Sequence, residues 1–286
     1  MIALPLSILT SSVLMILFKY FGKLNVNTFQ AITVNYVVAA TLGFVMSGNT
    51  PDPSLIHEPW AGFAGLLGIL FIMMFYVMAV SSQKVGVAIT TVANKMSLAI
   101  PVVAGIILYD EGLTVIKTIG VLGALIAVAL VVKPGSALNI DKRFLFLPVL
   151  IFFGSGTLDS IFKYCETHYV DAAQVAVFSA SLFGVAALAG ILTMIYRKIA
   201  QNKTLETKSI VAGVALGVPN YFSVHYLILA LQIPGLESTM MFPINNVGIV
   251  VVSTILAIIL FKEHLSKLNW IGILLALVSI VLIAFG

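Results

Sequence analysis

The amino-acid sequence predicts an all-α membrane protein with ten transmembrane helices, arranged as two inverted five-helix repeats. The first observation is composition: 60% of the 286 residues are hydrophobic and 9% are charged, whereas a soluble globular protein carries roughly 25% charged residues. The second is a series of apolar segments of about 20 residues, the length that crosses a bilayer as a helix. The third is a similarity between the two halves of the chain. The low charge excludes a disordered chain, a nucleic-acid-binding surface and an ordinary water-soluble enzyme.

Polar residues, glycines and prolines divide the sequence into ten apolar segments. Each is long enough to satisfy its backbone polar groups as one helix, which the hydrocarbon core requires. None alternates with the period of two that is typical of strands in a membrane barrel. The five spans of the first half lie at about 2–21, 28–47, 60–80, 87–108 and 114–132. The five spans of the second half lie at about 144–164, 172–195, 209–231, 238–261 and 267–285.

Two offsets relate the halves of the chain. At an offset of 152 residues, segment 106–130 aligns with segment 258–282, and 11 of the 25 positions are identical. Within this alignment, Ile119-Gly120 matches Ile271-Gly272. At a second offset of 144 residues, Phe18-Lys19-Tyr20 aligns with Phe162-Lys163-Tyr164 and Gln30 aligns with Gln174. We therefore predict a first five-helix repeat over 1–133 and a second over 144–286.

Because five is an odd number, the second repeat enters the membrane from the opposite side. The connection after span two contains no Lys or Arg, whereas the equivalent connection after span seven contains four. Opposite charge in equivalent loops agrees with the positive-inside rule. Along the whole chain, one side carries only Lys117, and the other carries Lys23, Lys84, Lys133, Lys142, Arg143, Arg197, Lys198, Lys203, Lys208, Lys262 and Lys267. This count places the basic side in the cytoplasm and both termini outside.

A glutamate follows spans four and nine (Glu111 and Glu263), and in each case a Leu-Thr/Ser turn and an Ile-Gly pair come next. A lysine lies near the end of the first span of each half (Lys19 and Lys163). Over the whole chain these features resemble the ten-helix EamA-type branch of the drug/metabolite transporter superfamily. The resemblance implies a transporter of small metabolites, commonly an exporter, with a cavity lined by spans 1, 3, 4, 6, 8 and 9. Members of that family usually keep both termini in the cytoplasm, so two orientations stay open.

Charged residues inside the spans are the first candidates for transport, because a charge at the centre of a span costs at least about 2.5–3.5 kcal/mol. Lys95, next to Asn94 in the middle of span four, is a candidate cation for a substrate carboxylate or phosphate; the alternative is a structural ion pair. Asp159 in span six is a protonatable coupling site, the partner of Lys95, or a local partner of Lys163 four residues later. Lys19 and Lys163 are coupling or gating candidates, although long side chains at span ends commonly snorkel to the headgroups.

Uncharged polar residues in spans eight and nine complete the candidate site. Asn220 and Tyr221 lie at the middle of span eight, and His225 follows as a candidate for proton coupling or as a hydrogen-bonded structural residue. Asn245 and Asn246 come shortly after Pro243. A proline frees backbone carbonyls, which is tolerated where a helix lines a cavity, and Pro101 and Pro219 act in the same way; a packing kink is the alternative. Glu237 is predicted to cap span nine, and Glu111 and Glu263 are interpreted as helix-start charges near the membrane surface.

The sequence therefore predicts a secondary active transporter, with an exporter favoured, that moves a small polar metabolite by alternating access. It predicts no enzyme activity, no metal site and no cofactor. The expected partners are a small-molecule substrate, the lipid bilayer and protons as a candidate coupling ion, with no nucleic acid, in a monomer or homodimer of the cell (inner) membrane. The alternative is a polytopic membrane enzyme that acts on a lipid-borne substrate through Asp159 or His225.

Overall fold

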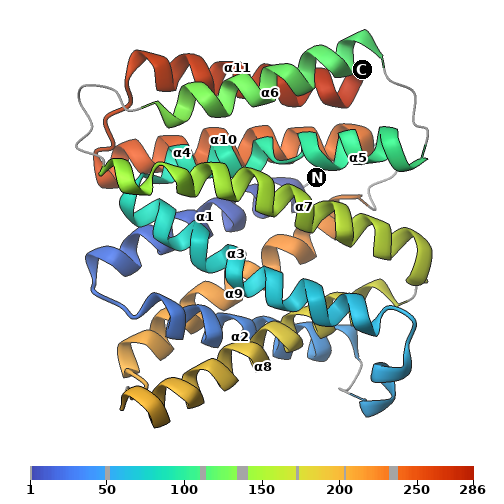
Figure 1. Ribbon diagram of the computed structural model, residues 1–286, viewed down its shortest axis with the longest axis vertical. Coiled ribbons are helices and arrows are strands. Elements are labelled where there is room, and N and C mark those ends of the chain that lie inside the picture. The colour runs from blue at the N-terminus through green and yellow to red at the C-terminus, as the bar shows by residue number, and fades with distance from the viewer. Residues whose placement is uncertain are drawn as a thin grey trace. The chain divides into compact units, whose positions relative to one another are not determined.

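The computed structural model describes residues 2–48, 52–109, 114–133, 141–171, 174–202, 204–231 and 238–286, so Glu111 and Glu237 lie outside it. Over these ranges the secondary structure is helical (Figure 1). The helices of the first half are α1 (Ala3–Lys23), α2 (Thr28–Ser47), α3 (Ala61–Lys84), α4 (Val87–Met96), α5 (Ala99–Tyr109) and α6 (Val115–Val132). Those of the second half are α7 (Phe146–Tyr169), α8 (Val175–Gln201), α9 (Thr207–Leu231), α10 (Ser238–Phe261) and α11 (Lys267–Phe285). Two 3₁₀ turns, η1 (Pro53–His57) and η2 (Lys142–Phe144), lie in connections.

Ten helices among the described residues are long and apolar enough to cross a membrane, with α4 and α5 together forming one of them. The prediction of an all-α, multi-pass membrane protein is confirmed. Three helices end four or more residues beyond the predicted limits: α3 continues to Lys84, α7 to Tyr169 and α8 to Gln201. The predicted ends at 80, 164 and 195 followed the apolar run, but a helix continues into the interface wherever its polar residues still support helical hydrogen bonds.

The chain divides into two compact units, each built from both halves of the sequence. Unit 1 consists of Met1–Lys19, Val77–Asp159 and Phe222–Gly286, and unit 2 consists of Tyr20–Tyr76 and Ser160–Tyr221. The units therefore do not follow the predicted repeats 1–133 and 144–286. Helices in a membrane bundle pack against their neighbours in space, and here these neighbours come from both halves.

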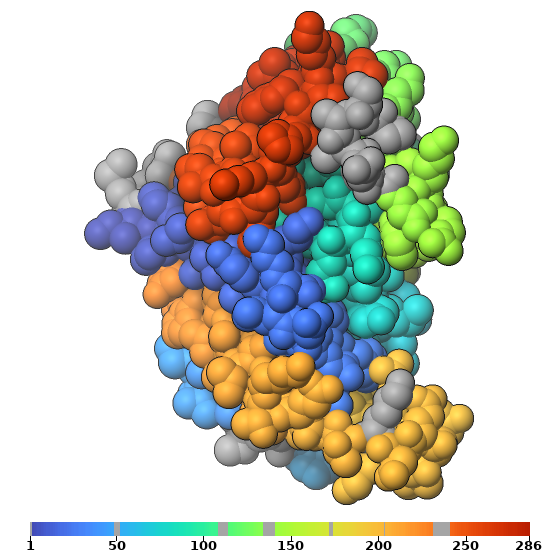
Figure 2. Space-filling model, turned by 90° about the vertical axis from the view of Figure 1, so that its left-hand side faces the viewer, coloured from blue at the N-terminus to red at the C-terminus, as the bar shows by residue number. Residues whose placement is uncertain are grey.

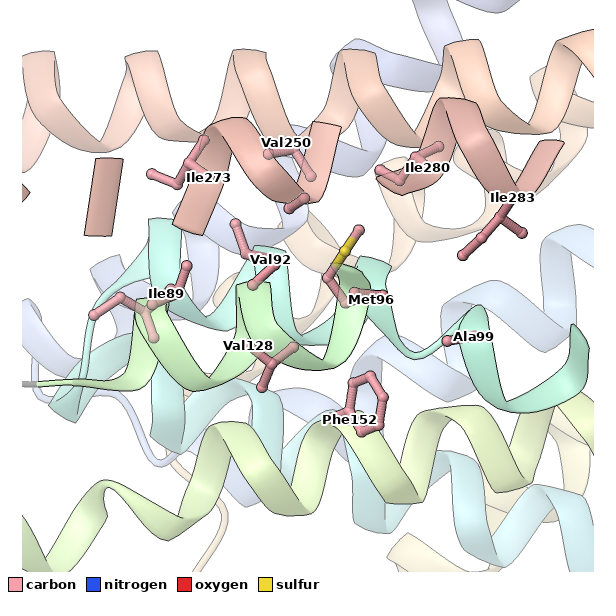
Figure 3. Close-up of a cluster of buried hydrophobic side chains, with 14 of the residues drawn as sticks. Ile89, Val92, Met96, Ala99, Val128, Phe152, Val250, Ile273, Ile280 and Ile283 are labelled. Atoms are coloured by element: carbon pink, nitrogen blue, oxygen red, sulfur yellow. The ribbon is translucent and has the colours of Figure 1, made fainter. Parts of the chain in front are cut away.

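The core of unit 1 is an apolar cluster shared by α4, α6, α7, α10 and α11 (Figure 3). Met96 and Val92 of α4 point into it, and Val250 of α10 and Ile280 of α11 belong to the same cluster. The alanines of α6 and α11, such as Ala124, Ala127 and Ala276, are also buried there. Small residues of this kind let helix backbones approach closely, which drives helix association in membranes.

Two glycines bring α6 and α11 into close contact, and these helices lie side by side in Figure 1. A Cβ atom on Gly120 would lie 2.8 Å from Ile283 Cγ1, and one on Gly272 would lie 2.5 Å from Val131 Cγ2. The early part of α6 contacts the late part of α11, and the late part of α6 contacts the early part of α11. The two helices are therefore antiparallel.

We expect Gly120→Ala to lower the melting temperature of the purified protein in detergent. The added methyl group meets Ile283, and overpacking of this kind costs about 1–3 kcal/mol, which exceeds the gain of about 1 kcal/mol from the better helix propensity of alanine. Gly184→Ala in α8 is the matched control, because a Cβ atom there has nothing within 4 Å. Equal shifts for the two variants would contradict the close approach.

Unit 2 contains a second antiparallel pair, α2 and α8. A Cβ atom on Gly43, late in α2, would lie 3.1 Å from Cβ of Ala180, early in α8. A Cβ atom on Gly190, late in α8, would lie 2.5 Å from Oγ1 of Thr33, early in α2. Glycines on both helices therefore set a short distance between their backbones.

Two glutamines hold the ends of this pair. Gln30 in α2 donates from Nε2 to the Thr204 carbonyl at 2.8 Å and accepts from the Glu206 amide at 3.0 Å. Gln174, which precedes α8, donates to a Glu58 carboxylate oxygen at 3.3 Å and accepts from Trp60 Nε1 at 3.4 Å. Each glutamine thus binds the segment that follows the other helix.

Candidate functional site

The candidate site in unit 1 starts at an interruption of span four. Helix α4 ends at Met96 and α5 begins at Ala99. The interruption lies four residues before Pro101, as expected from the clash of a proline ring with the carbonyl of residue i−4. At the interruption, Ser97 Oγ donates to the Asn94 carbonyl at 2.6 Å, and the Ile100 amide donates to the Ser97 carbonyl at 2.9 Å. Asn94 and Lys95 therefore occupy the last turn of α4, where a cation is favoured by the helix dipole.

Helix α7 approaches this interruption through Gly156. A Cβ atom on Gly156 would lie 2.7 Å from the Ser97 carbonyl oxygen and 2.5 Å from Ile100 Cδ1. No side chain larger than hydrogen fits there without movement. Asp159 lies three residues after Gly156 in the same helix, so this contact brings Asp159 toward the end of α4.

Lys95 and Asp159 attract each other electrostatically. The Lys95 side chain is half-buried, whereas Asp159 is exposed although it lies in a membrane-spanning helix. Neither forms a direct salt bridge within the part of the chain that the structure describes. The Lys95 ammonium and the Asp159 carboxylate thus attract each other, and both can still form hydrogen bonds with a bound solute or water. Lys163, the other partner considered for Asp159, lies one turn further along α7 and belongs to unit 2.

We expect Gly156→Val to reduce transport strongly and thermal stability only modestly. The larger side chain pushes α7 away from Ser97 and Ile100, which increases the separation of Asp159 from Lys95. The rate of efflux from proteoliposomes and the melting temperature measure the two effects. Gly184→Val in α8 is the matched control, because a Cβ atom there has nothing within 4 Å, and an equal loss of transport there would contradict a specific role for Gly156.

Lys19 pairs with a carboxylate inside the protein, which differs from the alternative that its side chain snorkels to the headgroups. Its Nζ lies 3.5 Å from Glu263 Oε1 and donates to the Gln83 carbonyl at 3.4 Å. The Lys19 side chain is 19% exposed and that of Glu263 is 10% exposed. The carboxylate compensates the lysine charge inside the protein, so this lysine needs no headgroup.

Glu263 is a helix-start charge for a helix other than the one that follows it. Its carboxylate accepts hydrogen bonds from the Val87 amide at 2.8 Å and the Ala88 amide at 3.3 Å, so it caps α4. The next helix, α11, is capped instead by Ser266 together with Asn269. The first amides of α4 and the Lys19 ammonium group surround the Glu263 carboxylate, and its place near the membrane surface stays a prediction.

The other polar candidates of unit 1 lie on α9 and α10. Asn245 is buried, and its Oδ1 has no hydrogen-bond partner among the described atoms. A buried acceptor without a partner costs about 1–3 kcal/mol, which favours a role in binding a ligand or water. Asn246 next to it is half-buried. Both α9 and α10 run through Pro219 and Pro243 as continuous helices, so these prolines do not interrupt their spans as Pro101 does.

His225 packs among aromatic rings. The Phe222 ring lies edge-on to it with centroids 6.0 Å apart, and the Tyr226 ring lies at 5.8 Å. Three remaining candidates, Asn220, Tyr221 and Lys163, belong to unit 2. Asn220 is buried, and the Tyr221 ring lies 3.8 Å from the position of a Cβ atom on Gly43.

Sequence reasoning missed three residues that organise this site. Ser97 closes the end of α4, Gly156 allows the approach of α7, and Gln83 binds α1 by donating to the Phe18 carbonyl at 3.1 Å. The position of Pro101 contains the signal for Ser97, because the residue four positions before a proline loses its helical partner. Nothing in the local sequence distinguishes Gly156 or Gln83 from neighbouring residues.

Comparison with known proteins places the chain in a family. No family model matches the sequence. An uncharacterized protein of Haemophilus influenzae is 30% identical to it, and the alignment covers 96% of this chain and 94% of the relative. The chain belongs to the family of this Haemophilus protein. The alignment extends over both halves of the chain.

The fold of this chain is similar to that of a solved crystal structure. It superposes with a TM-score of 0.60 and covers 98% of this chain and 94% of its own length, at 17% sequence identity. At this level of identity, the likeness concerns the fold alone.

Proposed function

We propose that the protein is a secondary active transporter of a small polar metabolite, with an exporter favoured, that works by alternating access in the cell (inner) membrane. In this proposal the chain is an inverted five-plus-five repeat related to the EamA-type drug/metabolite transporters. The observation that carries it is the interrupted span four, where Lys95 and Asp159 attract each other without a direct salt bridge. Interrupted helices and unneutralised charges within spans are typical of transporter binding sites.

The packing of α6 and α11 supports the inverted repeat. Gly120 and Gly272 are equivalent at the offset of 152, and so are the residues that they contact, Val131 and Ile283. Gly120 contacts Ile283 and Gly272 contacts Val131, so exchanging the two helices reproduces the contacts. A two-fold axis between antiparallel helices produces this relation, and an axis of this kind in the membrane plane relates inverted repeats.

The glutamines of unit 2 support the same symmetry at the second offset. Gln30 and Gln174 are 144 residues apart, as are Trp60 and Thr204. Gln174 binds Trp60 and Gln30 binds Thr204. Two equivalent glutamines thus form hydrogen bonds with two equivalent positions of the chain. Three equivalent pairs of spans pack against each other: α2 with α8, α4 with α10, and α6 with α11.

The enzymatic alternative has less support. It uses Asp159 or His225 as the catalytic group, but the electrostatic partner of Asp159 is Lys95. His225 lies against the Phe222 and Tyr226 rings. A charge pair in a half-buried site suits the binding of a polar solute better than acid–base catalysis on a lipid.

The test is a screen for efflux from proteoliposomes. Vesicles with purified protein are loaded in turn with amino acids, nucleosides and sugars, and release is compared with that from protein-free vesicles. We expect one chemical class to leave faster in the presence of protein, and release to change when an uncoupler removes an imposed proton gradient. Equal release from both vesicle types for all three classes would overturn the proposed transport, and insensitivity to uncoupler would remove protons as the coupling ion.

A further inference from the structure

Unit 2 contains a pocket at the basic end of α8. Its volume is about 180 Å³, several times the ~30 Å³ that a water molecule occupies in the liquid. The first turn of α2, the last turns of α8 and the segment leading into α9 form its walls. The end of α8 and the start of α9 form the amber surface in Figure 2. The two charged residues among those that line the pocket, Arg197 and Lys198, are both basic.

Both cations lack a counter-ion among the residues that the structure describes. The Arg197 guanidinium lies over the Phe29 ring with its Cζ 4.6 Å from the ring centroid, a geometry that orients it without neutralising its charge. Within the described ranges, neither Arg197 nor Lys198 forms a salt bridge. The nearby Glu206 carboxylate lies 3.4 Å from Lys208 Nζ instead. The pocket therefore attracts anions.

A second basic pair, Lys142 and Arg143, differs from Arg197 and Lys198 because one of its cations has a counter-ion. Arg143 donates to both Asp141 carboxylate oxygens, at 3.0 Å or less to Oδ2. These hydrogen bonds hold the pKa of Asp141 below its ordinary value, so the carboxylate is charged at neutral pH. Arg143 is thus neutralised within the protein, whereas Arg197 is not.

Apolar side chains form another part of the pocket wall, and some of them are exposed at the protein surface. Ile191, Ile195 and Leu205 line it, and Ile195 and Leu205 are each 49% exposed. Arg197 and Lys198 follow directly after the apolar part of the span, at the depth where basic side chains meet lipid headgroups. The hydrogen bonds of Gln30 to Thr204 and Glu206 fix the segment that closes the pocket.

We propose that this pocket binds the phosphate group of an anionic phospholipid. Arg197 and Lys198 bind the phosphate oxygens, and Ile191, Ile195 and Leu205 contact the first part of an acyl chain. A free phosphate ion has no group to place against these apolar side chains, which favours the lipid. The positive end of the α2 dipole, at Asn27 to Gln30, adds to the attraction.

The test is native mass spectrometry of the purified full-length protein with phosphatidylglycerol and with phosphatidylcholine of identical acyl chains. We expect the anionic lipid to bind roughly 30-fold more tightly than the zwitterionic one, the effect of two basic residues near a membrane surface. The double variant R197Q/K198Q should lose this preference. K142Q/R143Q, which removes the same charge from another basic pair of the chain, should keep it. Unchanged melting temperatures without lipid verify that both variants fold.

A third variant separates local geometry from net charge. Phe29→Leu keeps both cations but removes the ring beneath Arg197, and we expect it to weaken phosphatidylglycerol binding several-fold. Equal binding of the two lipids, or an equal loss in K142Q/R143Q, would overturn the proposed site. Displacement of phosphatidylglycerol by equimolar inorganic phosphate would overturn it too, by identifying a site for the soluble ion.

Discussion

Lys95→Met is expected to lower transport about 100-fold while the protein still inserts into the membrane. Truncating one partner of a charge pair costs about 2–5 kcal/mol once a bound substrate has excluded water from it, and ~2.7 kcal/mol corresponds to about 100-fold. The loss has two sources. The substrate can no longer bind the Lys95 ammonium group, and Asp159 no longer interacts with the positive charge of Lys95. The measurement is the initial efflux rate of the solute that the proteoliposome screen selects.

A double-mutant cycle shows whether the two residues act together. We expect Asp159→Asn alone to cause a similar loss, and Lys95→Met/Asp159→Asn to lose little more than either single variant, because coupled residues are not additive. Lys142→Met in the exposed turn η2 is the control for a lysine, and Asp171→Asn is the control for a carboxylate; both should transport normally. Multiplicative losses in the double variant would show that Lys95 and Asp159 act independently.

Glu263→Ala is expected to destabilise the protein by about 3 kcal/mol, at the lower end of the range for breaking a buried ion pair. The change leaves Lys19 without its carboxylate and removes the acceptor for the Val87 and Ala88 amides at the start of α4. Thermal unfolding in detergent, followed by helical circular dichroism, measures the effect. Adding Lys19→Met to this variant should recover part of the stability, since it removes the uncompensated cation.

The control is Glu206→Ala, which removes the ion pair with Lys208. In that pair the side chains are 42% and 52% exposed, and exposed pairs contribute about 1 kcal/mol or less. A loss as large as that of Glu263→Ala would mean that burial and the cap of α4 do not determine the contribution of Glu263.

The ten spans could be predicted because their signal is local. An apolar run of about 20 residues must form a helix in hydrocarbon, and nothing elsewhere in the chain changes that requirement. The interruption at Ser97 is local as well, since it follows from Pro101 four residues later. The helix ends at Lys84, Tyr169 and Gln201 were missed because polarity marks the edge of the hydrocarbon core and does not mark the end of a helix.

The contacts of the site depend on long-range packing. Lys95 and Asp159 are 64 residues apart, and only the approach of α7 at Gly156 makes them neighbours. Lys19 looked like a snorkelling lysine because its position at a span end gives no information about a carboxylate on another helix. Glu263 accepts hydrogen bonds from amides about 175 residues away in the chain. The equivalence of Glu263 with Glu111 in the two repeats could not show which helix Glu263 caps.

The hydrogen bonds of Gln30 and Gln174 differ in one respect that affects how the two halves of the chain can diverge. Gln30 binds main-chain groups of residues 204 and 206, which any amino acid other than proline supplies. Gln174 binds the side chains of Glu58 and Trp60, which few substitutions can replace. Residues 204 and 206 are therefore free to drift, while residues 58 and 60 are constrained. A deep mutational scan should show the second copy of this segment as permissive and the first as intolerant.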